Sequence, residues 1–164
     1  GIVVKNEISN KQLDELYTVA LQQGAKEALN VGPNGYPMMD VEVRLIDSKY
    51  VDGESTEMAY KIAATIAVKD ALRQANPILL EPVFKVEVVS PDEYMGDIIS
   101  DMNARRGRIE GISQGGTMQV ISCVAPLSEM FGYVTKLRSQ SQGRAVYTMT
   151  FSHYEPAIQK NGHY

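Results

Sequence analysis

The first half of the chain alternates short strand-like runs with two segments in which hydrophobic residues recur at helical spacing. Residues 1–5 predict a strand, and Ser9 and Gln12 form a capping-box pair that predicts the start of a helix. The hydrophobic positions that follow with a period of 3.6 residues are Leu13, Leu16, Tyr17, Ala20, Leu21, Ala28 and Leu29. We expect these residues to form the buried face of this helix.

A turn at 32–37 leads into residues 40–45, where hydrophobic and polar side chains alternate as in a half-buried strand. A polar loop follows, and Ser55 is the predicted N-cap of a second helix. The hydrophobic residues that share one face of that helix are Met58, Ile62 and Ile66. The predicted element order of the first half is therefore β-α-β-α.

The second half begins after residues 76–77, where the helical period stops and an extended hydrophobic run starts. Residues 83–89 predict a strand, and Ser90 with Glu93 predicts a capped helix start. The buried stripe expected on this helix consists of Tyr94, Met95, Ile98, Ile99 and Met102. Gly107 is the predicted end of the helix.

The rest of the second half predicts two strands, a helix and a last strand. The strands are 108–112 and 118–124, with a turn at 114–116. The helix covers 127–138, and its expected inward residues are Leu127, Met130, Phe131, Val134 and Leu137. The last strand has alternating inward residues at Ala145, Tyr147, Met149 and Phe151. The order βαββαβ is that of the ferredoxin-like arrangement.

The fold class predicted from these elements is α+β, with two small α/β-sandwich domains. The first domain, at 1–78, is a partial β-α-β-α unit with a tip loop at 48–54. The second domain, at 79–154, is ferredoxin-like, and residues 155–164 form a tail. At 164 residues the chain is long enough for two such cores.

Composition limits the possible functions. The formal net charge is −4, so any contact with nucleic acid must be local. Cys123 is the single cysteine, which excludes an intrachain disulfide, and its apolar neighbours predict a buried, inert thiol. We find no signal peptide and no membrane-length hydrophobic run, so a cytoplasmic location without a membrane partner is expected.

The sequence offers little for catalysis. The two histidines, His153 and His163, have no ligand spacing, and no G-x-x-x-x-G-K-[ST] loop is present. The carboxylates of Glu54 and Glu57 lie at a helix start, where the helix dipole already explains them. We therefore predict no catalytic residue, no metal site and no nucleotide site in this chain.

One basic segment stands out on this acidic chain. Between Met130 and Tyr154 there are three cations, Lys136, Arg138 and Arg144, and no acid. Spaced cations without acids are typical of a surface that binds a phosphate backbone, but an ordinary basic surface helix has the same pattern. Charge alone leaves both interpretations open.

Four ordered strings closely resemble the elongation factor G family of bacterial-type translation GTPases. They are GYPMMDVEVRL (35–45), STEMAYKIAATIAVKDAL (55–72), LLEPVFKVEVVSPDEYMGDIISDMNARRGRIEG (79–111) and PLSEMFGYVTKLRSQSQGRAVYTMTF (126–151). By this resemblance the first half is the C-terminal part of the family's fourth domain, and the second half is its fifth domain. The fold that the family implies agrees with the βαββαβ order.

The resemblance implies a ribosome-binding part of a translocase that moves tRNA and mRNA. GTP and Mg²⁺ would be bound by a G domain that precedes these domains, so no cofactor is expected here. The fourth domain would reach the decoding region through a tip formed by Ser48, Lys49, Tyr50, Val51, Asp52 and Gly53. The fifth domain would contact the sarcin-ricin loop, and the stalk-base RNA with its ribosomal protein, through Arg138, Ser139, Gln142 and Arg144.

The chain departs from the family at the tip, where the usual S-Y-H-D is replaced by Lys49-Tyr50-Val51-Asp52. The first strand of the fourth domain is also absent, which predicts an open sheet edge that could pair with a second copy. Two alternatives remain open. One is a ribosome-recycling or specialised paralogue of the translocase, and the other is a ferredoxin-like module that binds a small metabolite.

Overall fold

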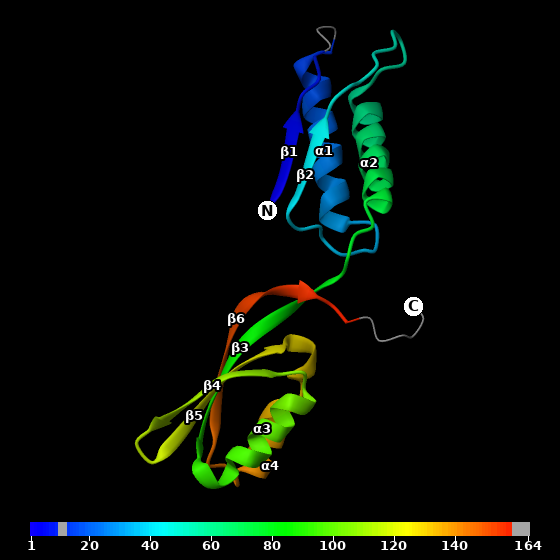
Figure 1. Ribbon diagram of the computed structural model, residues 1–164. Coiled ribbons are helices and arrows are strands. Elements are labelled where there is room, and N and C mark those ends of the chain that lie inside the picture. Colours follow the sequence, from blue (N-terminus) through cyan, green and yellow to red (C-terminus); the bar gives the residue numbers. More distant parts are fainter. Residues whose placement is uncertain (10–12, 159–164) are drawn as a thin grey trace. The chain divides into compact units, whose positions relative to one another are not determined.

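The computed structural model describes residues 1–9 and 13–158. The chain divides into two compact units, Gly1–Pro77 and Ile78–Tyr164, and each is described by itself. Both units mix helices and strands (Figure 1), which confirms the predicted α+β class.

The first unit has the predicted order: β1 (Ile2–Asn6), α1 (Glu15–Val31), β2 (Val41–Leu45) and α2 (Glu57–Gln74). The two strands pair in parallel. One sheet face packs on both helices, in a core formed by Ala25, Ala28, Leu29, Val68 and Leu72 with Val4, Met38, Val41 and Val43 against it. The other sheet face is charged, with Lys5 and Arg44 both paired to Glu42 at 2.7 and 2.6 Å.

Both helix starts in this unit differ from the prediction. Helix α1 begins at Glu15 and is capped by Asp14, whose carboxylate accepts a hydrogen bond from the Leu16 amide. The predicted cap partner Gln12 lies outside the described residues. Helix α2 is capped by Thr56, whose hydroxyl accepts from the Ala59 amide at 3.1 Å, because Ser55 is used inside the preceding loop.

The hydrophobic stripe of α2 faces outward. Met58, Ile62 and Ile66 share a face as predicted, but each is more than half exposed. The buried face is instead formed by Tyr60, Ala64, Val68 and Leu72. Helix α1 approaches this face at Gly24, where a Cβ atom would lie 2.1 Å from the Lys61 carbonyl oxygen. The close helix contact therefore requires glycine.

The second unit contains a four-stranded antiparallel sheet in the order β4-β5-β3-β6. Its elements are β3 (Leu80–Pro91), η1 (Asp92–Tyr94), α3 (Met95–Ala104), β4 (Arg108–Gly115), β5 (Met118–Pro126), η2 (Leu127–Glu129), α4 (Tyr133–Gln140) and β6 (Val146–Pro156). Helices α3 and α4 cover the same face of the sheet (Figure 1). This is the predicted ferredoxin-like βαββαβ fold.

Two ends in this unit differ from the sequence prediction. Ser90 is fully buried and donates its hydroxyl hydrogen to the Pro91 carbonyl, so it does not cap the following helix. Strand β6 continues through Glu155 to Pro156, because these residues pair with Glu81 and Leu80 of β3. The residues predicted to begin a tail therefore belong to the sheet.

The helix predicted at 127–138 is broken. Gly132 has φ = 73°, which separates η2 from α4 and changes the phase of the buried positions. Phe131 and Val134, which were predicted to point inward, are 78% and 41% exposed. Tyr133 takes the inward place and is fully buried against the Tyr147 ring.

Candidate functional site

The basic segment ends in a loop whose backbone is fixed by hydrogen bonds to the buried Ser141 side chain. This side chain is fully buried, and its hydroxyl donates to the Leu137 carbonyl at 2.7 Å and accepts from the Ala145 amide at 3.1 Å. The Gly143 amide donates to the Arg138 carbonyl at 2.9 Å. These bonds fix the path of the loop from the last turn of α4 into β6.

The backbone of the same loop takes two left-handed conformations in sequence, at Gln142 (φ = 52°) and Gly143 (φ = 77°). Glycine adopts this region at little cost, and a non-glycine residue there must be held by its surroundings. The Ser141 bonds supply that hold. The predicted contact residues Arg138, Ser139, Gln142 and Arg144 are all exposed around it.

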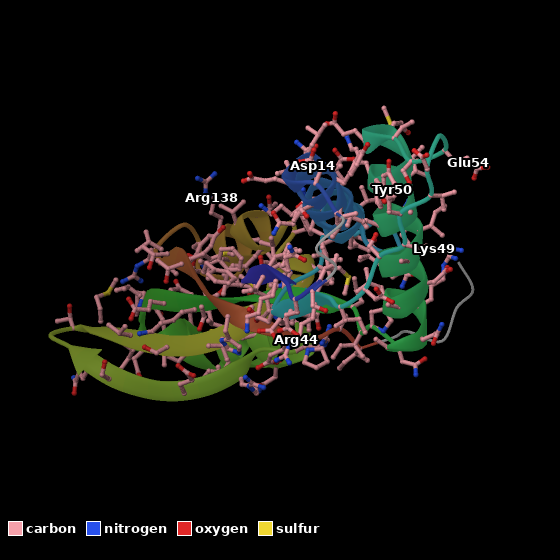
Figure 2. The ribbon with its side chains drawn as sticks, turned by 90° about the horizontal axis from the view of Figure 1, so that it is seen from above. Asp14, Arg44, Lys49, Tyr50, Glu54 and Arg138 are labelled. Atoms are coloured by element: carbon pink, nitrogen blue, oxygen red, sulfur yellow. The ribbon has the colours of Figure 1, made fainter. Side chains whose placement is uncertain are left out.

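The two arginines of this surface differ in whether a carboxylate pairs with them. Arg138 points away from α4 (Figure 2), and its guanidinium makes no ion pair with any residue that the structure describes. Arg144 forms an ion pair with Glu93, and its guanidinium lies 5.8 Å from the centre of the Tyr94 ring. A phosphate can bind Arg138 directly, whereas at Arg144 it must compete with a carboxylate.

Sequence reasoning missed Ser141, the residue that holds the loop. Its position gives a signal, because it comes one turn after the buried Leu137 and four residues before the buried Ala145. A serine in an inward position needs a hydrogen-bond partner inside the protein. The two backbone groups that it bonds supply those partners.

The predicted tip is a separate loop in the first unit. Its backbone is held at two places: the Tyr60 hydroxyl donates to the Lys49 carbonyl at 3.1 Å, and the Val51 amide donates to the Ser55 hydroxyl at 2.9 Å. Gly53 turns the chain with φ = 74°. The tip therefore belongs to the first unit, and the loop after α4 belongs to the second.

The side chains of the tip present one aromatic ring and one cation. The Tyr50 ring is about a third exposed, at 37%, and lies 6.2 Å from the Tyr17 ring, centre to centre. The neighbouring Asp52 carboxylate raises the pKa of Tyr50. Lys49 precedes Tyr50 in the chain and lies near α2 (Figure 2).

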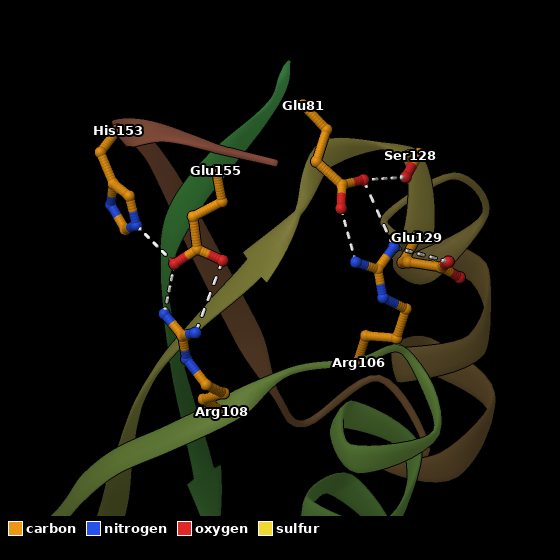
Figure 3. A network of polar contacts seen from close by, with 7 residues as sticks. All are labelled: Glu81, Arg106, Arg108, Ser128, Glu129, His153 and Glu155. Carbon is orange, nitrogen blue, oxygen red and sulfur yellow. Dashed lines mark hydrogen bonds and ion pairs between the residues drawn. The ribbon is translucent and has the colours of Figure 1, made fainter. Parts of the chain in front are cut away.

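The three clustered arginines after α3 are used inside the second unit. Arg105 bonds Asp101 at 2.9 Å, Arg106 bonds Glu81 at 2.5 Å, and Arg108 bonds Glu155 at 2.7 Å. Figure 3 shows the last two pairs, with His153 also 2.8 Å from the Glu155 carboxylate. The contacts with His153 and Arg108 lower the pKa of Glu155. These arginines are therefore structural contacts.

The described residues offer little that could hold a cofactor. Residues 1–9 and 13–158 contain no cluster of three His, Cys, Asp or Glu side chains that could hold a metal ion. Cys123 is fully buried, and burial raises the pKa of its thiol to about 11. An open hollow between α1 and α2 is lined by Gln23, Thr56, Glu57, Met58 and Lys61.

Within the same described ranges, none of the helices has the length and hydrophobicity needed to cross a bilayer.

Comparison with known proteins identifies the two units. The family model described as elongation factor G, domain IV, matches residues 1–76, and the one described as elongation factor G C-terminus matches residues 78–161. A crystal structure of a Thermus thermophilus protein is 34% identical, with a TM-score of 0.85. The match covers 96% of this chain but 24% of that chain, so the present chain spans about a quarter of its length.

The two α+β units and these matches define the chain as part of a translation elongation factor. It belongs to the elongation factor G family, and its units correspond to domain IV and to the C-terminal domain.

Proposed function

We propose that this chain is the non-catalytic, ribosome-binding part of a cytoplasmic elongation factor G-like GTPase that moves tRNA and mRNA. In this proposal GTP and Mg²⁺ bind to a G domain elsewhere in the longer protein. The tip loop contacts the decoding region. The loop after α4 contacts ribosomal RNA at the sarcin-ricin loop and the stalk base, beside a stalk-base ribosomal protein.

The observation that carries the proposal is the exposed Arg138 guanidinium in the last turn of α4, next to a loop that Ser141 fixes. A cation without a carboxylate partner among the described residues can form a charge-assisted bond to a phosphate oxygen without first breaking an internal pair. The exposed hydroxyl of Ser139 and amide of Gln142 add donors and acceptors that suit 2′-hydroxyl groups. The loop is already fixed by Ser141, so binding costs little ordering of the backbone.

Because the net charge of the chain is −4, its contact with RNA must be local. Because Arg138 neutralises a phosphate in this proposal, binding should weaken as the salt concentration rises. We would measure co-sedimentation of the chain with ribosomes over a salt series, for the wild type, Arg138→Ala and Lys136→Ala. The last variant removes an exposed cation from the same helix and is the matched control for charge. We expect Arg138→Ala to weaken binding by roughly 10- to 100-fold, as the loss of a charge-assisted bond does, and to lower the salt slope by about one.

Two results would contradict the proposal. One is a wild-type chain that does not sediment with ribosomes even at low salt. The other is equal weakening by Arg138→Ala and Lys136→Ala, which would show that bulk charge and not the loop governs binding.

Val51 at the tip favours a second candidate, the ribosome-recycling or specialised paralogue. The family's histidine offers a donor at this place, and valine offers none. The intact longer protein, assayed separately for translocation and for ribosome splitting, distinguishes the two functions. Splitting without translocation, together with translocation gained by Val51→His, would favour the specialised paralogue.

A further inference from the structure

Phe131 has the most exposed large hydrophobic side chain among the described residues, at 78%. It lies directly before Gly132, whose left-handed backbone ends η2 and starts α4. The sequence predicts a buried Phe131 in an unbroken helix at 127–138. The break at Gly132 therefore brings the ring to the surface.

The backbone beneath this ring is fixed from the neighbouring helix. The Arg105 guanidinium donates hydrogen bonds to the carbonyl oxygens of Glu129, at 2.5 Å, and of Phe131, at 3.2 Å. Arg105 is itself held by Asp101 and lies over the buried Tyr133 ring, 5.2 Å from its centre. The Phe131 ring is thus presented on a rigid support.

The helix that follows Phe131 presents an apolar and a cationic side chain on one exposed face. Val134 and Arg138 lie one turn apart on the exposed side of α4, whereas Lys136, the control cation, is two residues from each and faces elsewhere. The segment between Met130 and Tyr154 contains no acid. Helix α4 has eight residues, a length of about 12 Å, so one folded RNA loop can reach both its ends.

We infer that Phe131 is a base-stacking residue of the same RNA surface, and that it takes an unstacked base next to the phosphate bound by Arg138. The inference rests on the proposed function and names the kind of RNA feature that the surface selects: a loop or bulge with a base turned outward. An exposed aromatic ring just before a helix that carries an exposed arginine suits such a base. A purely apolar pocket on a protein would make no use of the exposed Arg138 guanidinium on the helix that follows.

The test uses the fact that the chain contains no tryptophan. Phe131→Trp places one fluorophore at the proposed stacking position, and Phe151→Trp places one at an exposed position on β6 as the matched control. Each variant is titrated with protein-free large-subunit ribosomal RNA folded in Mg²⁺. We expect RNA to quench the fluorescence of the Phe131→Trp variant and to leave the control unchanged.

Binding of the same RNA is measured for Phe131→Leu and Phe131→Tyr, with circular dichroism to verify folding. Leucine keeps an apolar side chain without an aromatic face, and we expect about 5- to 150-fold weaker binding, the range for loss of one base–aromatic contact. Tyrosine keeps the ring and should retain wild-type affinity. This pattern would support the inference.

The outcomes separate the inference from the proposed function. If the wild type binds neither ribosomes nor the RNA at low salt, the proposed function fails and the inference falls with it. If the wild type binds but Phe131→Leu binds equally well, or the Phe131→Trp variant shows no quenching, stacking by Phe131 is wrong while the Arg138 contact stands. A blue shift in the emission of Phe131→Trp with whole ribosomes but no change with RNA alone would place the ring in a protein pocket and would also overturn the inference.

Discussion

The buried hydroxyl of Ser141 accepts a hydrogen bond from the backbone amide of Ala145 at 3.1 Å. This bond ties the end of α4 to the start of β6. Arg138 and Ser139 lie in the last turn of α4, and Gln142 and Arg144 lie on the loop that the bond closes. The position of Arg138 and Gln142 therefore depends on a side chain that does not itself reach the surface.

Ser141→Ala should loosen this loop. The substitution leaves a buried amide without its partner, and we expect the free energy of unfolding to fall by about 1–2 kcal/mol. Urea denaturation followed by circular dichroism measures the loss, and hydrogen exchange at the Ala145 amide localises it. Ser139→Ala changes an exposed serine in the last turn of α4, two residues before Ser141, and should stay within about 0.5 kcal/mol of wild type. Equal effects of the two substitutions would remove the structural role assigned to Ser141.

Glu93→Gln should strengthen RNA binding. The substitution removes the carboxylate that pairs with Arg144 and competes there with a phosphate. Because the pair is exposed, we expect a modest gain of about 2- to 5-fold in affinity for ribosomes. Asp92→Asn removes an equal charge one residue earlier and serves as the control in the same sedimentation assay. If both substitutions give the same gain, general repulsion and not the Arg144 pair is responsible.

Gly24→Ala and Gly96→Ala should change stability in opposite directions. At Gly24 the added methyl group would lie 2.1 Å from the Lys61 carbonyl oxygen, and we expect a loss of about 1–3 kcal/mol in the free energy of unfolding. At Gly96, in α3, no atom outside the chain neighbours and the backbone of the helix itself lies within 4 Å of the new Cβ, and alanine should stabilise the helix by about 0.5–1 kcal/mol. Urea denaturation of both variants checks the signs, and a stable Gly24→Ala protein would contradict the close helix contact.

Cys123 should be inert in the folded protein. Burial raises the pKa of its thiol from 9.0 to about 11, so the neutral form is favoured by folding. Its contribution to stability is complete below the pKa of the unfolded thiol and is lost as the pH rises from about 9 to about 11. Alkylation by iodoacetamide at about pH 8, just below the ordinary thiol pKa, should be absent in buffer and complete in urea when read by intact mass. Rapid labelling of the folded protein would be incompatible with this burial.

The sequence predicted the order of the elements well because hydrophobic periodicity reflects burial against a sheet. It was less informative where the backbone conformation of one residue changes which helix positions face the core. Gly132 could be read as an ordinary helix residue, yet its left-handed backbone exposes Phe131 and buries Tyr133. The choice between Ser55 and Thr56 as a helix cap depended on a bond from the Val51 amide, which no spacing rule contains.

The candidate site was predicted in part, for a related reason. Exposed polar residues such as Arg138 follow from the pattern of the helix and from the resemblance to a family. The difference between Arg138 and Arg144 does not, because Glu93 approaches Arg144 from a segment 51 residues earlier in the chain. The hydrogen bond from Arg105 to the Phe131 carbonyl joins residues 26 positions apart, so local sequence patterns do not predict it either. Such contacts depend on tertiary structure.

The ion-paired face of β1 and β2 restricts how this small sheet can grow. Lys5, Glu42 and Arg44 cover it with alternating charge, and an apolar layer placed there would have to desolvate every one of them. The backbone groups along the strand edges carry no such penalty, since a new strand would satisfy them. A polypeptide that extends this sheet would therefore join at a strand edge, with its own apolar side chains toward α1 and α2.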